Sequence, residues 1–549
     1  MRPGLVRPQR PVVDPTLTAE FRVPGDLRVP RQRDTGPVRP AYAPVPLPPT
    51  EDEKYLYRGR RLPLLMGTSL ISFGCLTFSQ VMFIRLTPWL LLLTPLLAFT
   101  VAYYVVSFVV NVGTRGFDLR AHSRLVNRWR PAEYPSVDVF LPICGEPAHV
   151  VGNTWSCVRK MVAHYPGQVV VHVLDDSADD GFRRTALGFG FRYHRRPNRG
   201  WFKKAGNMRH AFERTENDFI LILDADFAPR VDMLEEMLPY FDEDPTLGIV
   251  QSPQYFRVHK GQGWLERGAG TVQELFYRSV QVSRQHHGAA ICVGSCAVYR
   301  RAALDAIGGT ALIEHSEDVH TGFNLKMKDW GLKYIPVVLA AGLCPGDVDS
   351  FFTQQYRWCA GSMSLLSSRK FWTTKLPFRG RLSYISGFCY YLHTGLYTLV
   401  TPALPLVLLA LFPSEVALAN YLFVLPSLVY NLVVVPVWHR TPYGVDVFTV
   451  KLIYGWAHLF AIWDIVRGRP MGWQPTGGTG KKSRTRRLWH GLRFWTLGLA
   501  LVWVGLAAYR MLTAHPLDYV PMFLSGMFAL LVACQSLLVR PTQDIEVIA

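Results

Sequence analysis

The pattern of apolar and polar positions encloses one soluble stretch between long apolar runs. A segment that crosses a hydrocarbon core of about 30 Å needs roughly 20 consecutive apolar residues. Two runs of that length precede residue 113 and four follow residue 384. The six predicted spans are Leu62–Ile84, Pro88–Val112, Ile385–Phe412, Val416–Trp438, Leu488–Met511 and Tyr519–Val539.

A seventh apolar stretch, Val450–Val466, is ambiguous because it carries Lys451, His458 and Asp464. If it crossed the membrane, the basic run that follows it, Lys481–Arg487, would lie outside the cell. Loops rich in Lys and Arg usually stay on the cytoplasmic side. We therefore predict an interfacial helix here, with six crossings and with the soluble domain and both termini in the cytoplasm.

Short apolar runs alternate with helix-like stretches in the soluble part, a pattern typical of repeated βα units in an α/β domain. Ligands of such sheets bind at the carboxyl ends of parallel strands. The sequence therefore predicts a mostly parallel sheet with a nucleotide site at that edge. The expected strands are Val137–Leu141, Val169–Leu174, a strand from Phe219 that ends at Asp224, Ile249–Gln254 and Ile291–Tyr299.

Pairs of carboxylates follow two of these strands. Asp224 and Asp226, one residue apart, stand at the end of the strand that begins at Phe219. Asp175 and Asp176 stand at the end of the strand that begins at Val169. Two carboxylates so close repel each other unless a divalent cation lies between them, which makes the first pair a metal and nucleotide hypothesis. A helix cap at Asp224–Asp226 and a turn at Asp175–Ser177 are the structural alternatives.

Two later segments carry further candidate chemistry. Ser316 and the two acids that follow it begin a helical stretch, where Ser316 is a candidate N-cap and one of the carboxylates could serve as a general base for a hydroxyl that attacks a sugar. In Asp349–Trp372, helical spacing places Gln354, Arg357 and Trp358 on one face. An interfacial helix with an aromatic anchor and a snorkelling arginine is the alternative for this segment.

Composition and charge change this picture in two ways. The chain has 549 residues, 49% of them hydrophobic, and a net charge of +18. The basic residues cluster in the first sixty positions and between Arg467 and Arg493, beside apolar runs, so we read them as cytoplasmic juxtamembrane loops and not as a nucleic-acid surface. Residues 1–60, rich in Pro and Arg, are predicted to be a disordered tail.

Taken together, the motifs resemble the processive membrane glycosyltransferases of family 2 that include cellulose synthase. The resemblance covers roughly residues 60–540. It rests on four ordered motifs, supported by Lys204–Asn207 and Gly294–Arg301. The four are Asp175-Asp176, Asp224-x-Asp226, Ser316-Glu317-Asp318 and Gln354-x-x-Arg357-Trp358.

The resemblance implies a GT-A-like catalytic domain inserted into a bundle of about six membrane helices, with an interfacial segment that carries the Gln-x-x-Arg-Trp motif. The implied divisions are a tail (1–60), a membrane hairpin (61–112), the catalytic domain (113–348), interfacial helices (349–384), spans three and four (385–438), an interfacial helix with a gating-type loop (439–487), and spans five and six with a short tail (488–549).

Residue roles follow from the same resemblance. Asp318 is the implied catalytic base, and Trp358 the implied platform for the acceptor sugar. Mg2+ or Mn2+ is the implied cofactor. The implied nucleotide-sugar contacts are Asp175 or Asp176, Lys204, Asp224, Gln354 and Arg357; the metal ligands are Asp224 and Asp226; and the gating-loop residues are Trp473, Thr476 and Lys481.

The implied activity is processive, inverting polymerisation of a β-linked polysaccharide, foremost a β-glucan from UDP-glucose, and its translocation across the plasma membrane. The alternatives are another polymer, from UDP-N-acetylglucosamine or GDP-mannose or with mixed linkage, and a non-processive transferase that glycosylates a lipid. A pure transporter would not need four acidic motifs.

The expected partners are the UDP-sugar, the growing chain and the bilayer, and such an enzyme is compatible with accessory export or chain-processing proteins. The sequence Ile143-Cys144-Gly145-Glu146 lacks a tyrosine that the family places near uracil.

Overall fold

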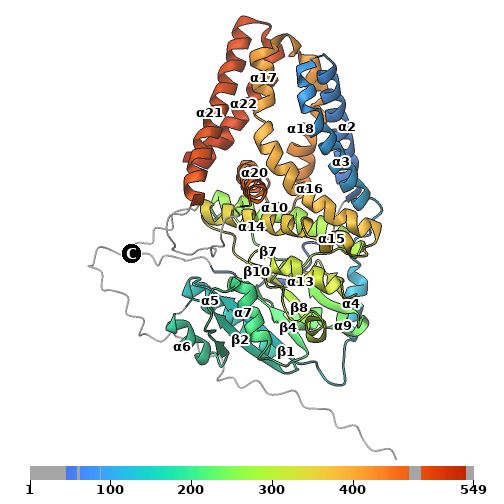
Figure 1. Ribbon diagram of the computed structural model, residues 1–549, viewed down its shortest axis with the longest axis vertical. Coiled ribbons are helices and arrows are strands. Elements are labelled where there is room, and N and C mark those ends of the chain that lie inside the picture. The colour runs from blue at the N-terminus through green and yellow to red at the C-terminus, as the bar shows by residue number, and fades with distance from the viewer. Residues whose placement is uncertain (1–44, 59–61, 87, 178, 469–483, 539–549) are drawn as a thin grey trace, which may run out of the picture. The chain divides into compact units, whose positions relative to one another are not determined.

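The computed structural model describes residues 45–58, 62–86, 88–177, 179–468 and 484–538. The predicted gating-loop residues Trp473, Thr476 and Lys481 lie outside these residues. Between 113 and 348 the chain forms an α/β domain, and long apolar helices precede and follow it (Figure 1).

A sheet of seven strands forms the centre of the soluble domain, in the order β3-β2-β1-β4-β8-β6-β9. The βα pattern predicts a mostly parallel sheet, and β3, β2, β1 and β4 are indeed parallel, as are β6 and β9. β8 departs from it, because it runs antiparallel to both β4 and β6. The strands are β1 Val137–Ile143, β2 Val169–Asp175, β3 Arg192–His194, β4 Phe219–Ile222, β6 Leu247–Gln251, β8 Ala297–Arg300 and β9 Gly331–Tyr334.

Alternate side chains of these strands enter two apolar cores, one on each face of the sheet. Val139 and Leu221 contribute to the first core, whereas Phe140 and Ile222 contribute to the second. All four residues of β4 are buried, as expected for a strand covered on both faces. The first face is covered by α5 Ala148–His164, α6 Asp180–Gly188, α8 Met233–Met237 and α9 Pro239–Glu243, and the second by α7 Lys203–Phe212, α12 Arg301–Asp305 and α13 Glu317–Lys326.

The sequence therefore predicted the α/β class with a mostly parallel sheet correctly, with errors in two strands. The strand predicted at Ile291–Tyr299 begins only at Ala297, and the one predicted at Ile249–Gln254 is shifted to Leu247–Gln251. A second, three-stranded sheet was not predicted because its strands have only two or three residues each, too few for a period to show. It consists of β5 Ala228–Pro229, β10 Ala340–Gly342 and β7 Tyr255–Phe256.

Residues 45–58 are ordered, although the sequence predicted a disordered tail up to residue 60. They include the short helix α1, Glu51–Lys54, which begins with a capping box at Thr50. The Lys54 ammonium is buried and bonds Asp232 at 2.7 Å and Glu236 at 2.6 Å. Glu53 pairs with Arg257 at 2.7 Å. These ion pairs fix the segment to the catalytic domain. The Pro-rich composition of the segment does not predict them.

Within the part of the chain that the structure describes, six helices are long and apolar enough to cross a membrane, as expected of a multi-pass membrane protein. Five coincide with predicted spans, but the fourth predicted span, Val416–Trp438, is not one helix. A 3-10 helix, Leu418–Phe423, precedes an apolar helical stretch, Leu425–Trp438, that is too short to cross a membrane by itself. The long helices are α2 Leu62–Leu86, α3 Thr94–Asn111, α16 Phe378–Val400 with α17 Ala403–Leu411, α20 Val445–Val466, α21 Arg484–Thr513 and α22 Pro516–Leu538.

Helix α20, the sixth candidate span, differs from the other five. It is seen along its axis in Figure 1, where α21 and α22 run up the picture, so it lies across the bundle. Within its most apolar window 56% of the residues are buried, against 11% to 28% in the other five. It packs against α14, Val348–Leu366, and against α16. This placement agrees with the interfacial helix that the charge pattern predicts.

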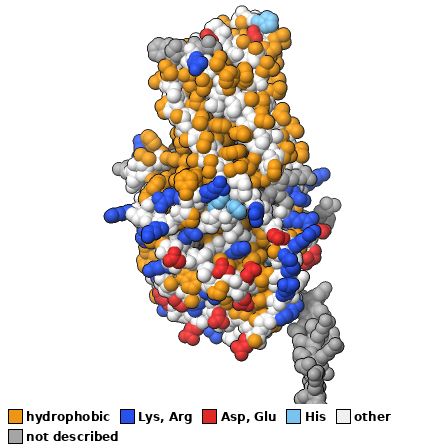
Figure 2. All heavy atoms as spheres, turned by 90° about the vertical axis from the view of Figure 1, so that its right-hand side faces the viewer, with side chains coloured by type: hydrophobic (Ala, Val, Ile, Leu, Met, Phe, Trp, Pro, Cys, Tyr) orange, Lys and Arg blue, Asp and Glu red, His pale blue; other side chains and the backbone are white. Residues whose placement is uncertain are grey.

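Apolar side chains dominate the upper part of the face drawn in Figure 2, and charged side chains occupy the lower part. Lys and Arg side chains gather where the two regions meet. Such a basic border is typical of the cytoplasmic side of a membrane protein.

Candidate active site

Four of the predicted site elements meet at the carboxyl edge of the sheet. Lys204 lies in the first turn of α7, and its ammonium forms an ion pair with the Asp224 carboxylate beyond the end of β4. The same ammonium donates to the Gly294 carbonyl oxygen at 2.8 Å. A Cβ placed on Gly294 would lie 2.8 Å from Asp318 Oδ2, so Asp318 stands directly against this glycine. The structure thus brings Lys204, Asp224 and Asp318 into one pocket.

Charges in this pocket shift the pKa values of its acids. Burial, and next the Glu317 carboxylate, raise the pKa of Asp318 to about 7. Burial also raises the pKa of Glu317, while Lys204 acts in the opposite direction. An aspartate with a pKa near neutrality is suited to accept a proton and to release it again.

Asp226 lies beside Asp224 as the spacing predicted. Burial, and next the Asp224 carboxylate, raise the pKa of Asp226 to about 7. Glu146, whose Oε2 accepts from the Cys144 N–H at 2.7 Å, adds to this negative field. Carboxylate oxygens in a negative field fit a hard divalent cation such as Mg2+ or Mn2+. No group of three or more potential ligands is assembled among the described residues, so such a cation would need further oxygens from the nucleotide or water.

The pair that ends β2 is engaged by protein side chains. The Asp175 carboxylate is 0% exposed and accepts from Ser177 at 2.6 Å, from Tyr193 and from Arg195 at 3.2 Å. Asp176 receives two bonds from Arg196, at 2.8 and 2.5 Å. Of the two, only Asp176 retains exposed surface, about 6% of its side chain.

Sequence reasoning missed Tyr193, Arg195 and Arg196, which lie on and after the short strand β3. Arg196 is 1% exposed and also donates to the carbonyl oxygens of Trp201, at 2.6 Å, and Lys203, at 2.9 Å. Asp176 therefore helps to position the backbone next to Lys204. The sequence offered one signal for this, the paired arginines directly before a Pro-Asn turn.

Helix α14 carries the Gln-x-x-Arg-Trp motif against the helix that holds Asp318. Gln354, Arg357 and Trp358 are half-buried on one face of α14, as the spacing predicted. Burial lowers the pKa of Arg357, whereas Glu317, Asp224 and Asp318 raise it, so this guanidinium faces the acids of the pocket.

Close contact between α14 and the start of α13 occurs at Gly361. A Cβ on this residue would overlap the Ser316 side chain. Ser316 precedes α13 with a φ of 55° and makes no side-chain cap bond, contrary to the predicted capping role. Its left-handed backbone and the glycine opposite are what allow the two helices to approach.

A cavity of about 540 Å³ opens from this pocket towards the membrane helices. Asp318, Ser316 and Trp358 line one part of it. Residues of α2, α3 and α16, such as Met66, Tyr104 and Tyr390, line another part. The volume lies within the range of about 300–1,000 Å³ that is usual for ligand sites.

Comparisons with known proteins identify relatives of this chain. The profile described as "Glycosyl transferase family group 2" matches residues 219–434. The cellulose synthase catalytic subunit (UDP-forming) of Pseudomonas fluorescens is 33% identical over 313 residues, which is 55% of this chain and 41% of the relative. A putative cellulose synthase of Komagataeibacter xylinus is 28% identical over 384 residues, 68% of this chain and 25% of the relative. The chain thus spans less than half the length of these relatives.

Among solved structures, a mannosyltransferase from Pyrobaculum calidifontis in complex with GDP-Man and Mn2+ is similar to this chain. It has 16% sequence identity and a TM-score of 0.46, with 67% of this chain and 99% of that chain covered. Residues 219–434 thus match the profile of family 2 glycosyltransferases, and the chain is related to the bacterial cellulose synthase catalytic subunits.

Proposed function

We propose that the protein is a processive, inverting glycosyltransferase that builds a β-glucan from UDP-glucose and passes the growing chain into the membrane. The observation that carries this proposal is the cavity shared by Asp318, Trp358 and the helices α2, α3 and α16. A transferase that adds one sugar needs no such path behind its acceptor site. Continuous space between site and membrane helices supports a polymer that advances after each addition.

Asp318 acts as the base in this mechanism. The hydroxyl oxygen at the end of the acceptor attacks the anomeric carbon of the donor, and its proton passes to the Asp318 carboxylate. The bond from the anomeric carbon to the diphosphate oxygen breaks, and UDP leaves with that electron pair. Because the attack comes from the face opposite the leaving group, an α-linked donor gives a β-linked product.

Charged side chains around the pocket stabilise the leaving diphosphate. Lys204 and Arg357 supply positive charge, and Gln354 supplies an amide donor on the same face of α14. Asp176, the more exposed acid at the end of β2, is the one we assign to the nucleotide, while Asp175 holds Tyr193 and Arg195 in place. Mg2+ or Mn2+ held by Asp224 and Asp226 would neutralise charge on the diphosphate.

The acceptor sugar stacks on Trp358, whose indole face suits the apolar face of a pyranose. The protein resides in the plasma membrane in this proposal, with the catalytic domain and both termini in the cytoplasm. UDP-glucose is the proposed donor because the curated relatives are UDP-forming cellulose synthase subunits. Donor choice depends on a few contacts to the sugar hydroxyls, so it should be sharp.

Product size tests the proposal. Purified protein in detergent or vesicles is incubated with Mg2+ or Mn2+ and labelled UDP-glucose, UDP-N-acetylglucosamine or GDP-mannose. We expect long product from UDP-glucose, which a β-glucanase degrades. A single-sugar lipid would instead identify a non-processive transferase, and a preference for UDP-N-acetylglucosamine would exclude the glucan.

Asp318→Asn is the matched variant for this assay. It should bind UDP nearly as well as the wild type and transfer no sugar, because the lost group acts on the acceptor. A loss of UDP affinity as large as the loss of activity would move Asp318 into the nucleotide site.

A further inference from the structure

The cavity between the catalytic pocket and the membrane helices has an unusual balance of charge. Among its described lining residues, Asp318 at the catalytic end is the sole carboxylate, whereas Arg284 and Lys451 bring two basic side chains. Most of the other polar lining consists of Ser, Asn and Tyr side chains. The interior beyond the catalytic site therefore has a positive potential.

Arg284 stands in this cavity on α11, Gln281–His286. The residue is 6% exposed, and its Nη2 donates to the Ser383 carbonyl oxygen at 3.0 Å. Its guanidinium also lies 5.8 Å from the centre of the Tyr384 ring. A Cβ on Gly387 would overlap the guanidinium, so a glycine on α16 makes room for it.

Arg284 forms no ion pair with any described residue, and no carboxylate contributes to the shift of its pKa, which burial lowers. Arginine nevertheless keeps its charge at any physiological pH. A buried charge without an ionic partner is expensive, and among the described residues the Ser383 carbonyl oxygen and the Tyr384 ring are what offset it. Retaining such a charge next to a membrane passage points to a function.

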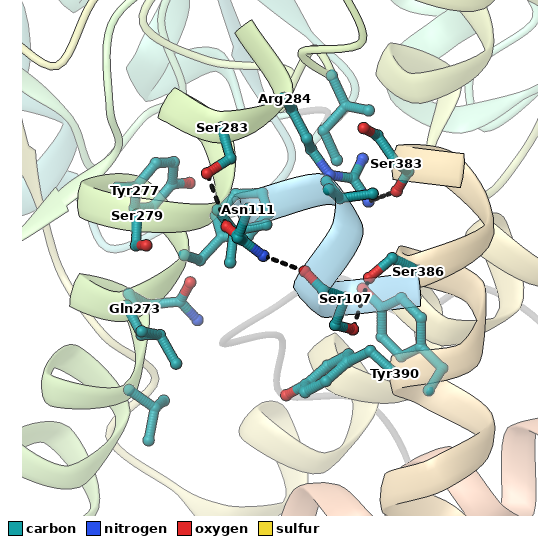
Figure 3. Close-up of a pocket in the computed structure, with 18 of the residues that line it drawn as sticks. Ser107, Asn111, Gln273, Tyr277, Ser279, Ser283, Arg284, Ser383, Ser386 and Tyr390 are labelled. Carbon is teal, nitrogen blue, oxygen red and sulfur yellow. Dashed lines mark hydrogen bonds between the residues drawn. The ribbon is translucent and has the colours of Figure 1, made fainter. Parts of the chain in front are cut away.

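Polar side chains surround Arg284 and connect three elements (Figure 3). Ser107 of α3 bonds Ser386 of α16 at 3.0 Å, and Asn111 of α3 accepts from Ser283 of α11 at 2.7 Å. The close-up shows these side chains around the same space as the Arg284 guanidinium. A lining of this kind admits water, and with water it would admit protons and metal cations.

We propose that Arg284 is an electrostatic barrier that keeps the sugar-chain passage closed to protons and metal cations. The proposal rests on the proposed function insofar as the cavity is taken as the path of the polymer. A fixed positive charge in a narrow polar passage repels cations strongly because little water screens it. A neutral sugar chain meets no such penalty, and its hydroxyl oxygens can accept bonds from the guanidinium.

Lys451 of α20 adds to the same field. Its ammonium donates to the Tyr443 hydroxyl at 2.6 Å, and among the lining residues it is the second cation of the cavity. Arg284 remains the principal barrier in this proposal because its guanidinium presents a fixed charge in the same cavity as the polar side chains of Ser107, Asn111 and Ser386.

The test measures ion leak and needs no sugar donor. Full-length protein is reconstituted in vesicles that contain a pH-sensitive dye, and proton and potassium entry are followed after an imposed gradient. Wild-type vesicles should stay tight. Arg284→Gln should leak cations about tenfold faster or more, whereas Arg284→Lys, which keeps the charge, should stay near the wild type.

Arg379→Gln is the matched control, since it removes one exposed arginine of α16 that does not line the cavity. It should leave the leak unchanged. Equal tightness of Arg284→Gln and wild-type vesicles would overturn the proposal, and so would a leak in Arg284→Lys as fast as in Arg284→Gln. Escape of a large trapped dye from Arg284→Gln vesicles would also overturn it, because the variant would then be a damaged protein and not an opened barrier.

The outcome is independent of sugar transfer. A chain that makes no polymer from any nucleotide sugar would refute the proposed function in its own assay, with the leak measurement unaffected. A polymerising enzyme whose Arg284→Gln variant stays tight would refute the barrier alone.

Discussion

Replacing Gly294 by alanine tests how closely the structure sets the position of the catalytic aspartate. Gly294 has a φ of 76°, in the left-handed region, and a Cβ there would lie 2.8 Å from Asp318 Oδ2 and 3.2 Å from its Cγ. The normal separation of a carbon and an oxygen atom is about 3.3 Å or more, so the carboxylate must retreat by roughly 0.5 Å. Displacements near 1 Å can reduce turnover about a hundredfold.

Gly308→Ala is the matched control for this change. Gly308 has a φ of 72°, and a Cβ on it would meet nothing within 4 Å. Both substitutions therefore carry the same backbone strain, about 1–2 kcal/mol. Only the first one touches Asp318.

The assay compares the two variants for thermal unfolding, UDP affinity and initial rate of transfer. Both should lose similar stability. Gly294→Ala should fall about tenfold to a hundredfold in kcat with UDP binding largely retained, whereas Gly308→Ala should stay within about twofold of the wild type. A full kcat in Gly294→Ala would refute the placement of Asp318 against Gly294. An equal loss in both variants would show that backbone strain, and not contact, limits the rate.

Three further outcomes follow from the pocket. Because the pKa of Asp318 is raised to about 7, the carboxyl stays protonated to higher pH than usual, so the transfer rate should climb between about pH 6 and 8; a flat profile would exclude Asp318 as the base. Asp226→Asn should weaken Mn2+-dependent UDP binding about tenfold or more while leaving metal-free thermal stability no lower, since it removes repulsion from Asp224; unchanged metal dependence would argue against this ligand. Gly361→Ala should reduce stability by about 1–3 kcal/mol through overlap with Ser316, and adding Ser316→Gly should restore most of it in a double-mutant cycle; additive losses would contradict the contact.

Strand ends were the part of the site that the sequence could predict. The run Phe219–Leu223 is apolar at every position, so the sequence predicts both that the strand is buried and where it ends. Asp224 is therefore placed at the carboxyl end of the strand. Helical spacing likewise sets Gln354, Arg357 and Trp358 on one face of α14. Local periodicity was sufficient in both cases.

Direction and long-range pairing were not predictable. The apolar sequence of β8 is compatible with a strand parallel or antiparallel to β4. The direction of β8 follows only from its pairing with Ile220 and Leu221 in the structure. The bonds of Tyr193 and Arg195 to Asp175 join positions about twenty residues apart, with no periodic signal. The break of the predicted fourth span falls between Phe423 and Leu425, where a 3-10 helix gives way to an α-helix, and a count of apolar residues ignores such a change.

The ion pairs of α1 have a consequence for how the membrane hairpin is held. Lys54 binds the catalytic domain on one side of the hairpin, and the chain enters the same domain again at α4, Leu119–Arg128, on the other. The hairpin α2–α3 is therefore a closed loop with two anchors on one rigid support, which restrains how far either helix can tilt. A soluble fragment that starts at residue 113 would lose Lys54 and leave the Glu236 carboxylate buried without its ammonium. Such a fragment should fold better when residues 45–58 are joined to it in place of the hairpin.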